Sequence, residues 1–241
     1  MFADRPVTGA TKNTVTSAAI EKMLVLMLLW ISGVGGQIDM RGKLFAFTEE
    51  SLFVLIFPDH EGPFTEGTVC MRFHADLTPK YSLFSLATVN TSIFHLYSYL
   101  GASNEPLLTV SNHEEYYHFP GKNFSEWTSV CATWRPSVWG LFVNEKKYER
   151  ENASNVHVDG DHFFFIGDDF FGEGFHEVEP FVGEMTDVNM WDKALTDEDM
   201  MDYFAGEEMS GNIIDWKALD FRPFGNVSIE DYNDPYPCMA I

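Results

Sequence analysis

The chain has 241 residues, 45% of them hydrophobic and 15% aromatic, so it can bury a sizeable core and is not a disordered segment. Its 37 Asp and Glu residues outnumber its 15 Lys and Arg residues, which gives a formal net charge of −22. Nucleic-acid backbones repel such a charge, so this composition argues against nucleic acid as a partner. An acidic surface is instead compatible with cations or basic partners.

The first 36 residues are typical of a segment that directs secretion. An apolar run at residues 23–30 follows Lys22 and precedes the small residues 33–36. This order matches a signal peptide, and the run is too short to cross a bilayer, which takes about 20 residues. We therefore expect a secreted chain whose mature part begins at Gln37, with either a long leader or a start at Met23. The alternative is a buried core strand or helix. Nothing later in the sequence resembles a transmembrane anchor.

From residue 43 onward, short segments rich in β-branched and aromatic residues alternate with turn signals, which predicts an all-β sandwich. The expected strands are 43–47, 52–57, 68–75, 81–88, 93–99, 107–110, 116–119, 128–134, 140–143, 162–166 and 181–191. Two of them carry one cysteine each, Cys70 and Cys131. This pattern suggests a single buried disulfide between neighbouring or facing strands, as expected in an oxidising compartment.

One segment departs from the β pattern and predicts a short helix near residues 196–205. Thr196 is a good N-cap, and three acids follow it in the first turn, where the helix dipole favours negative charge. Met200 and Tyr203 belong to one apolar face, and Gly206 can end the helix. A lone helix must pack on one face of the sandwich, which leaves the other face for another role.

Two further features fit an extracellular chain. The tail, residues 231–241, contains two prolines and the third cysteine, Cys238, so we expect loose order there and hypothesise an intermolecular disulfide. Four Asn-x-Ser/Thr sequons become glycan acceptors only if the chain enters the secretory pathway. They begin at Asn90, Asn123, Asn152 and Asn226.

Three stretches in the same order resemble the pentraxin family. Residues 129–137, Ser-Val-Cys-Ala-Thr-Trp-Arg-Pro-Ser, resemble its signature His-x-Cys-x-Ser/Thr-Trp-x-Ser/Thr, with serine in place of histidine and the last hydroxyl one residue late. Residues 182–192 and 212–219 resemble two further family stretches, the first of them highly specific. The resemblance covers roughly residues 40–230, so it implies one pentraxin-like domain over residues 37–230.

This resemblance implies an antiparallel jelly-roll of two sheets, of the concanavalin and laminin-G type, with a Cys70–Cys131 disulfide and one helix on one face. It also implies a cyclic oligomer, usually of five subunits. On the face opposite the helix, family members bind a calcium pair that holds phosphocholine, phosphoethanolamine or sugars. Many are soluble, non-enzymatic recognition proteins of innate immunity.

The candidate calcium loop is residues 167–180, which contains two internal glycines and five acids. Calcium takes six to eight oxygen ligands, so carboxylates and amides must converge on it from separate loops. The resemblance places Asp169 on the family's aspartate ligand. It places Asp168 on the residue that ligates through its backbone carbonyl.

This loop also departs from the family pattern, since it is about two residues shorter and lacks one glutamate. His176 stands where the family has an acidic ligand, a role that Glu177 could take, and Glu179 replaces a glutamine. The second loop offers only Asn90 of an Asp-Asn pair. The predicted metal ligands are therefore Asn90, Asp168, Asp169, Glu177 and Glu179. They would hold one Ca²⁺ or the full pair; the alternative is a charged loop without metal.

Aromatic residues of the strand at 93–99 could supply a face for choline-like cations, and we single out Phe94 and Tyr97. The alternative for both is ordinary strand core. The leading function is a secreted pattern-recognition protein that binds headgroups or sugars. A second interpretation is a calcium-independent structural or protein-binding oligomer. A third, glycoside hydrolysis, would use Glu177 and Glu179 as paired carboxylates, but no third acid follows them.

Overall fold

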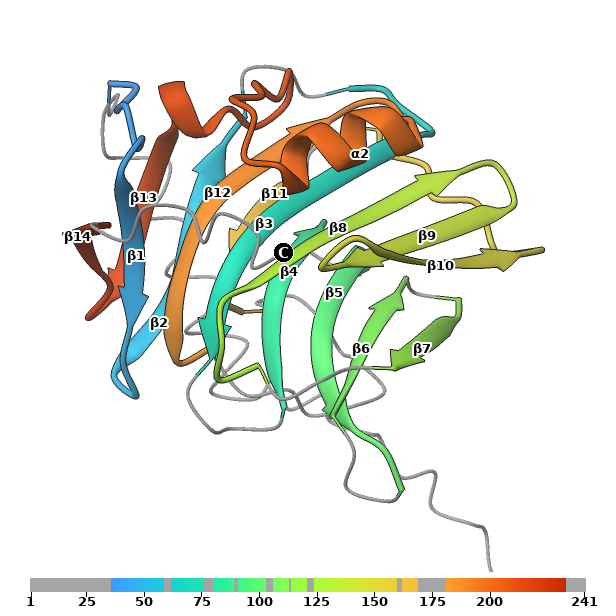
Figure 1. The fold of residues 1–241 in the computed structure, drawn as a ribbon, viewed down its shortest axis with the longest axis horizontal. Helices are drawn as coiled ribbons and strands as arrows, with labels where there is room; N and C mark the ends of the chain where they lie inside the picture. The colour runs from blue at the N-terminus through green and yellow to red at the C-terminus, as the bar shows by residue number, and fades with distance from the viewer. Residues whose placement is uncertain are drawn as a thin grey trace, which may run out of the picture. The chain divides into compact units, whose positions relative to one another are not determined.

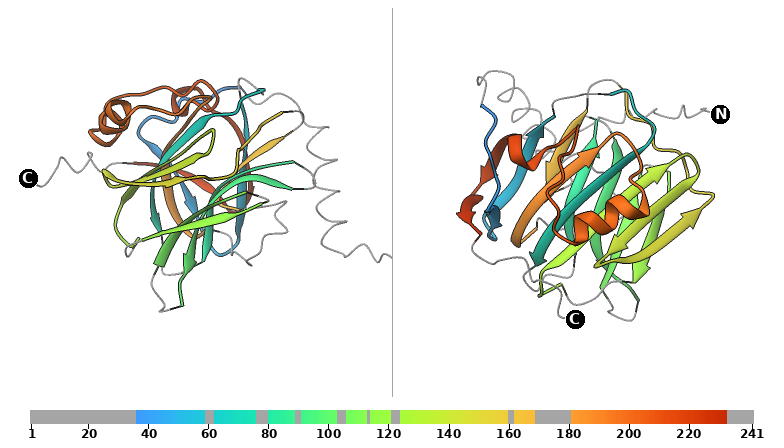
Figure 2. Two further views of the ribbon diagram at one scale, coloured as in Figure 1. Left: turned by 90° about the vertical axis from the view of Figure 1, so that its right-hand side faces the viewer. Right: turned by 45° about the horizontal axis from the view of Figure 1, so that its top comes forward.

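The computed structural model describes residues 36–58, 62–75, 80–88, 91–102, 106–112, 114–120, 124–159, 162–168 and 181–232. These residues form two antiparallel sheets of seven strands each and a short α-helix, as Figures 1 and 2 show. The predicted all-β sandwich is confirmed. Within the described ranges, no helix is long and apolar enough to cross a membrane. Residues 1–35, Asn90, Asn123 and Cys238 lie outside these ranges, so the predictions for them stay predictions.

The strand orders define the two layers. The first sheet contains, in spatial order, β10 (Lys146–Glu151), β9 (Val138–Val143), β8 (Thr128–Arg135), β3 (Gly67–Ala75), β12 (Gly183–Trp191), β1 (Lys43–Phe47) and β14 (Ser228–Asp231). The second contains β13 (Asp220–Gly225), β2 (Ser51–Phe57), β11 (Phe163–Ile166), β4 (Tyr81–Ala87), β5 (Ser92–Leu100), β6 (Pro106–Ser111) and β7 (Tyr116–Pro120).

Three strands that the sequence did not predict, β10, β13 and β14, all lie at sheet edges. Their side chains are largely exposed or only half-buried. An edge strand needs little apolar surface, so it lacks the alternating pattern by which buried strands are recognised.

The core between the sheets is built from large aromatic side chains. Trp134 is fully buried, and its ring centroid lies 4.5 Å from that of Phe94 on the facing sheet. On the neighbouring strand, Gly67 pairs with Trp134, and a Cβ at Gly67 would lie 2.2 Å from the Trp134 ring. Glycine at this position therefore makes room for the indole.

The predicted disulfide between Cys70 and Cys131 is confirmed. The two residues are directly paired on the adjacent strands β3 and β8, with an S–S distance of 2.01 Å. On β3, Val69 and Met71 face the core between the sheets, whereas Cys70 faces the opposite side. Strand β3 is therefore buried on both faces.

The cover over Cys70 is the predicted helix, α2 (Asp197–Phe204), which lies on the outer face of the first sheet in Figure 1. Thr196 caps its N-terminus, and Thr196 and Asp199 form a reciprocal capping box. Met200 and Tyr203 are buried and join a cluster with Cys70 and Cys131. The outer face of the second sheet is thus the face away from the helix (Figure 2).

Replacing Gly67 by Ala should destabilise the fold by about 1–3 kcal/mol, because the added methyl group displaces a fully buried indole. Urea unfolding measures the effect. The matched control is Trp134→Phe, alone and combined with Gly67→Ala. The smaller ring should relieve the clash, so the double variant should be less destabilised than the sum of the single variants. Strict additivity would contradict this explanation.

Candidate functional site

The predicted calcium loop is anchored at the end of β11 on the second sheet. Gly167 follows β11, and its N–H donates to the Leu83 carbonyl at 3.1 Å. Its own carbonyl accepts from the Phe181 N–H at 2.7 Å. Gly167 and Phe181, which lie on either side of the loop, are therefore in direct contact. Asp168, the first residue beyond this anchor, is half-buried. A predicted ligand is therefore held at the base of the loop.

The other predicted ligands, Asn90, Asp169, Glu177 and Glu179, lie outside the described residues, so their convergence stays a prediction. The same holds for the paired-carboxylate hypothesis for Glu177 and Glu179. Across the ranges that the structure describes, no group of three or more His, Cys, Asp or Glu side chains could hold a metal ion.

The described strands show how far apart the two loops with predicted calcium ligands begin. Ile166 pairs with Phe84, whereas the hairpin that carries Asn90 begins beyond Ala87. Ala87 lies four residues beyond Leu83 on β4, which is about 13 Å at the ordinary rise of a strand. The loop that starts at Asp168 must cross that distance to share an ion with Asn90.

The two predicted ligand-contacting residues lie on opposite faces of β5. Phe94 is fully buried between the sheets against Trp134, so it offers no surface to a ligand. This placement agrees with the alternative of strand core. Tyr97 is turned to the outer face, where its ring stacks on His95 with 4.5 Å between centroids. The reason is the two-residue period of a strand, which separates position 94 from positions 95 and 97.

Tyr97 belongs to a larger group that we call the aromatic–histidine row. Its members are His95, Tyr97, Tyr99, Tyr116 and His118. They lie on β5 and β7 and are bridged by β6, since Thr109 pairs with both Tyr97 and His118. Two ring contacts connect the row on the β7 side: Tyr99 with His118 at 5.5 Å and His118 with Tyr116 at 5.0 Å. The row therefore spans three strands of the face away from the helix.

Hydroxyl groups hold the rings of this row in place. A hydrogen bond of 2.9 Å joins His95 Nε2 to Ser82 Oγ, and one of 2.7 Å joins His118 Nδ1 to Thr109 Oγ1. Burial raises the pKa of Tyr97 to about 12, although Ser111 and Thr109 hydrogen-bond to it, so the phenol is neutral at physiological pH. At the exposed end lies Tyr116, whose side chain is 45% exposed. His95 and Tyr97, at the other end of the row, are buried, with 4% and 3% of their surface exposed. The ring faces open to a ligand are therefore those of Tyr99, Tyr116 and His118.

Sequence reasoning did not recognise the two histidines of this row, because no metal or triad spacing connects them. The signal present in the sequence was alternation: His95-x-Tyr97-x-Tyr99 on one strand and Tyr116-x-His118 on another. Only the register of β5, β6 and β7 shows that these alternating sets meet.

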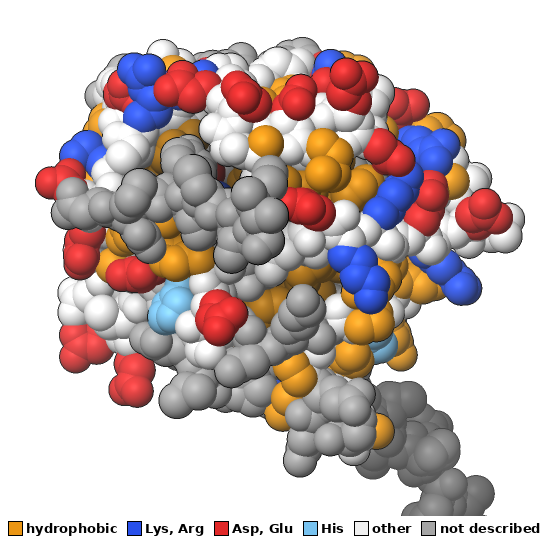
Figure 3. All heavy atoms as spheres, viewed as in Figure 1, with side chains coloured by type: hydrophobic (Ala, Val, Ile, Leu, Met, Phe, Trp, Pro, Cys, Tyr) orange, Lys and Arg blue, Asp and Glu red, His pale blue; other side chains and the backbone are white. Residues whose placement is uncertain are grey.

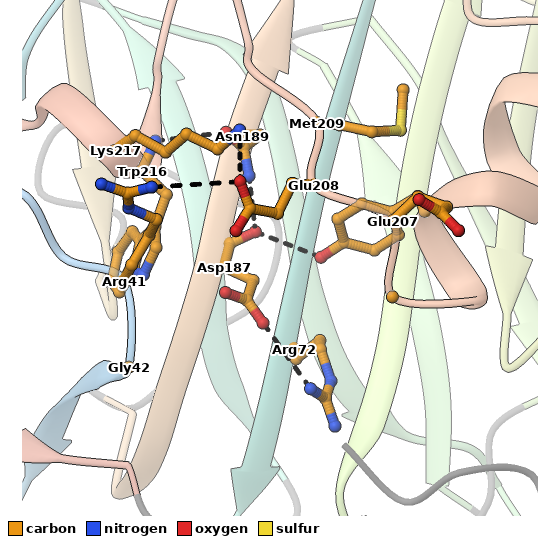
Figure 4. Close-up of a pocket in the computed structure, with 12 residues that line it drawn as sticks. Arg41, Gly42, Arg72, Asp187, Asn189, Glu207, Glu208, Met209, Trp216 and Lys217 are labelled. Atoms are coloured by element: carbon orange, nitrogen blue, oxygen red, sulfur yellow. Dashed lines mark hydrogen bonds and ion pairs between the residues drawn. The ribbon is translucent and has the colours of Figure 1, made fainter. Parts of the chain in front are cut away.

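The opposite, helix-bearing face contains a pocket of about 190 Å³ (Figure 4). It is lined by Arg41, Gly42, Arg72, Asp187, Asn189, Tyr203, Gly206, Glu207, Glu208, Met209, Trp216 and Lys217. Figure 3 shows acidic side chains gathered along this side of the molecule. Three cationic and three anionic side chains line the pocket, so they balance in formal charge.

A buried ion pair lies in this pocket. Arg72 Nη1 is 3.6 Å from Asp187 Oδ2, and the Arg72 side chain is only 7% exposed. The guanidinium also lies 5.8 Å from the ring centroids of both Trp127 and Tyr232. Arg72 thus connects β3 to β12, to the segment before β8 and to the chain beyond β14.

Asp187 occupies a strained position in β12. Its φ is 55°, in the left-handed region, and it lies at a register shift between Thr186 and Asn189. The Tyr203 hydroxyl and the Asn189 amide donate to its carbonyl at 3.1 and 3.2 Å. Burial raises the pKa of the Asp187 carboxyl, and the nearby Arg72 offsets this only in part.

Replacing Arg72 by Met should lower the free energy of unfolding at neutral pH by up to about 3–5 kcal/mol, because it removes the counter-charge of a carboxylate that is only 21% exposed. The folded-state pKa of Asp187 is already raised, and this change raises it further. Protonation removes the uncompensated charge, so the deficit should shrink below that pKa and grow as pH rises through it.

Urea unfolding of the Arg72→Met variant at acidic and neutral pH measures this dependence. The double variant Arg72→Met/Asp187→Asn is the control, since it removes both charges and asparagine tolerates the left-handed backbone. It should recover much of the loss. A deficit of the same size at every pH would contradict the role assigned to the ion pair.

Comparison with known proteins agrees with this fold. The model of the Pentaxin family matches residues 43–231. Mucosal pentraxin of Mus musculus is 33% identical in an alignment of 230 positions that covers 88% of this chain and 98% of that protein. C-reactive protein of Xenopus laevis is 30% identical in an alignment of 214 positions that covers 85% of this chain and 90% of that protein. A solved structure, the native heptameric SAP-like pentraxin of Limulus polyphemus, superposes with a TM-score of 0.63 at 23% identity, covering 81% of this chain and 98% of that one. The chain therefore belongs to the pentaxin family, the pentraxins.

Proposed function

We propose that this chain is a secreted, non-enzymatic recognition protein of innate immunity that binds small headgroups or sugars through the outer face of the second sheet. The observation that carries the proposal is the aromatic–histidine row, which lies on the face away from the helix. Family membership supports it, because C-reactive protein and serum amyloid P-component are among the relatives of similar sequence.

The chemistry of the row suits two ligand classes. Aromatic faces attract the quaternary ammonium group of phosphocholine, and the same faces can stack against a sugar ring. Lys80 lies beside the row, with Nζ 5.3 Å from the Tyr99 ring centroid, where it can pair with a phosphate group. At the exposed end of the row, the Tyr116 hydroxyl can bond to sugar hydroxyls.

The proposal includes calcium bound by Asn90, Asp168, Asp169, Glu177 and Glu179, as one ion or as a pair. Hard oxygen donors of this kind are the ligands that calcium prefers. The half-buried Asp168 at the anchored base of the loop supports a site there, whereas His176 would be a poor ligand for this ion.

The opposite edges of the first sheet support assembly into a ring. Edge strand β10 carries three basic residues, Lys146, Lys147 and Arg150, against two acidic ones, Glu149 and Glu151, whereas edge strand β14 carries only the acidic Glu230 and Asp231. A contact between β10 of one copy and β14 of the next is head-to-tail, and such contacts close into rings when the rotation permits. We propose a cyclic homo-oligomer, five subunits being the number usual in the family. A ring would multiply weak single-site affinities.

Retention of the full chain on phosphocholine and sugar resins, with and without chelator, tests the binding mode. We expect calcium-dependent retention on one of them. Release of a calcium-loaded sample by chelator supports the metal site. Retention that persists in chelator supports recognition of the ligand without calcium and contradicts the proposed role of the metal site. A chain that neither resin retains contradicts recognition of these ligands and leaves the structural or protein-binding oligomer.

Replacing the exposed Tyr116 by Ala should weaken ligand binding by about 0.5–1 kcal/mol, or about two- to five-fold, if the row contacts ligand. The matched control is Met201→Ala, because Met201 is equally exposed but lies on α2. Isothermal titration compares the two. Equal affinities for both variants and the unaltered chain would place the ligand elsewhere.

Reversing charge at one sheet edge should break the ring. Lys146→Glu or Glu230→Lys alone should lower the subunit number in native mass spectrometry at low salt, since like charges would then meet. Combining the two changes should restore assembly. Lys193→Glu, at an exposed position outside both edges, is the control. Unchanged assembly in both single variants would contradict this contact.

A further inference from the structure

Two of the four sequons, at Asn152 and Asn226, lie within the described residues, and the structure distinguishes them. The Asn226 side chain is engaged, because its Nδ2 donates to Glu50 Oε2. Its backbone N–H donates to the Glu50 carbonyl at 3.2 Å, and its own carbonyl accepts from Ser51 Oγ at 2.8 Å. The turn before it is also tight, since a Cβ at Gly225 would lie 2.6 Å from the Glu50 carbonyl oxygen. A glycan added to Asn226 before folding would leave one Nδ2 hydrogen for Glu50 and would crowd this tight turn, so chains that carry it should fold less well and be scarce among secreted molecules.

Asn152 has none of these constraints. Like Asn226 it is exposed, but it directly follows the edge strand β10 and makes none of the contacts described for Asn226. Its φ is 57°, a left-handed conformation that asparagine adopts more readily than most residues. Among the described residues, no hydrogen bond engages its amide group. The folded chain can therefore accommodate a large group on Asn152.

The third residue of this sequon, Ser154, is held in the fold by three hydrogen bonds. Its Oγ accepts from Asn112 Nδ2 at 2.8 Å, its N–H donates to Glu115 Oε1, and its carbonyl accepts from the Trp139 indole at 3.0 Å. The hydroxyl of a sequon must be accessible to the transferring enzyme. A glycan on Asn152 must therefore be attached before the hydrogen bonds of Ser154 form this corner of the fold.

We propose that Asn152 carries an N-linked glycan, added during translocation before this corner folds, and that Asn226 does not. The inference rests on the proposed secretion. The donor is an oligosaccharide linked to a lipid diphosphate. A bond forms between Asn152 Nδ2 and the anomeric carbon, the bond from that carbon to the diphosphate breaks, and the amide loses one proton. Nothing is oxidised or reduced, and Nδ2 keeps one hydrogen.

The position gives the glycan a structural consequence. Strand β10 is the open edge of the first sheet, and open edges invite pairing with other chains. A glycan after Glu151 shields that end of the edge. Lys146, proposed above for the contact between copies, lies at the other end, about 17 Å away along the strand. The glycan would therefore limit edge pairing at the Arg150 end of β10 and leave the Lys146 end open for the contact between copies.

The test is site mapping of the full chain secreted by mammalian cells. Peptide N-glycosidase converts each occupied asparagine to aspartate, which peptide mass spectrometry locates. We expect conversion at Asn152 and none at Asn226. The variant Asn152→Asp, which keeps the left-handed backbone accessible, should lose the mass of one glycan, whereas Ser154→Thr should retain it.

The outcomes separate this inference from the proposed function. A chain that reaches the medium with Asn152 unoccupied, or with Asn226 occupied, overturns the inference and leaves secretion intact. A chain that stays in the cytosol without glycan overturns secretion, and the inference fails with it.

Discussion

The fold depends on strand β3 being buried on both faces. Its inward side chains, including Val69 and Met71, fill the space between the sheets, and Cys70 on its other face lies under helix α2. The disulfide joins this strand to β8 at the centre of the buried layer. Because β3 also pairs with β12, it holds together the three strands on which the helix rests. Burial of one strand thus fixes both the core and the position of the helix.

This arrangement gives the two outer faces different chemistry. The helix-bearing face has a charged pocket, a buried ion pair and a strained aspartate in β12. The face of the second sheet has rings and hydroxyl groups on β5, β6 and β7. A layer of aromatic core separates them, with Trp134 and Phe94 in contact across it. Ligand recognition and contacts to other proteins can therefore use separate surfaces of one subunit.

Most of the buried fold was predictable from the sequence, because burial leaves a periodic pattern. The capped helix and the cysteine-bearing strands followed from local composition and were confirmed. Edge strands such as β10 were missed, since half-exposed strands do not need apolar alternation. The side chains on the outer face of the second sheet were harder to predict, because neighbouring residues of β5 face opposite ways. The sequence did not distinguish Phe94 from Tyr97 as ligand contacts. The structure shows that Phe94 packs between the sheets, whereas Tyr97 lies on the outer face.

The ion pair of Arg72 and Asp187 lay beyond prediction for another reason. Its partners are far apart in sequence, and a register shift in β12 brings the Asp187 carboxylate to Arg72. Nothing in local composition marks such a shift. The same is true of the row of rings, which exists only through the register of three strands.

The exposed end of that row has a consequence for divergence among related chains. Tyr116 and His118 lie on β7, the outermost strand of its sheet, and belong to no part of the core between the sheets. If the row contacts ligand as proposed, substitutions at these two positions would change ligand preference without disturbing the packed interior. Selection can therefore act on specificity here at little cost in folding, and this strand is where closely related chains should differ most in what they recognise.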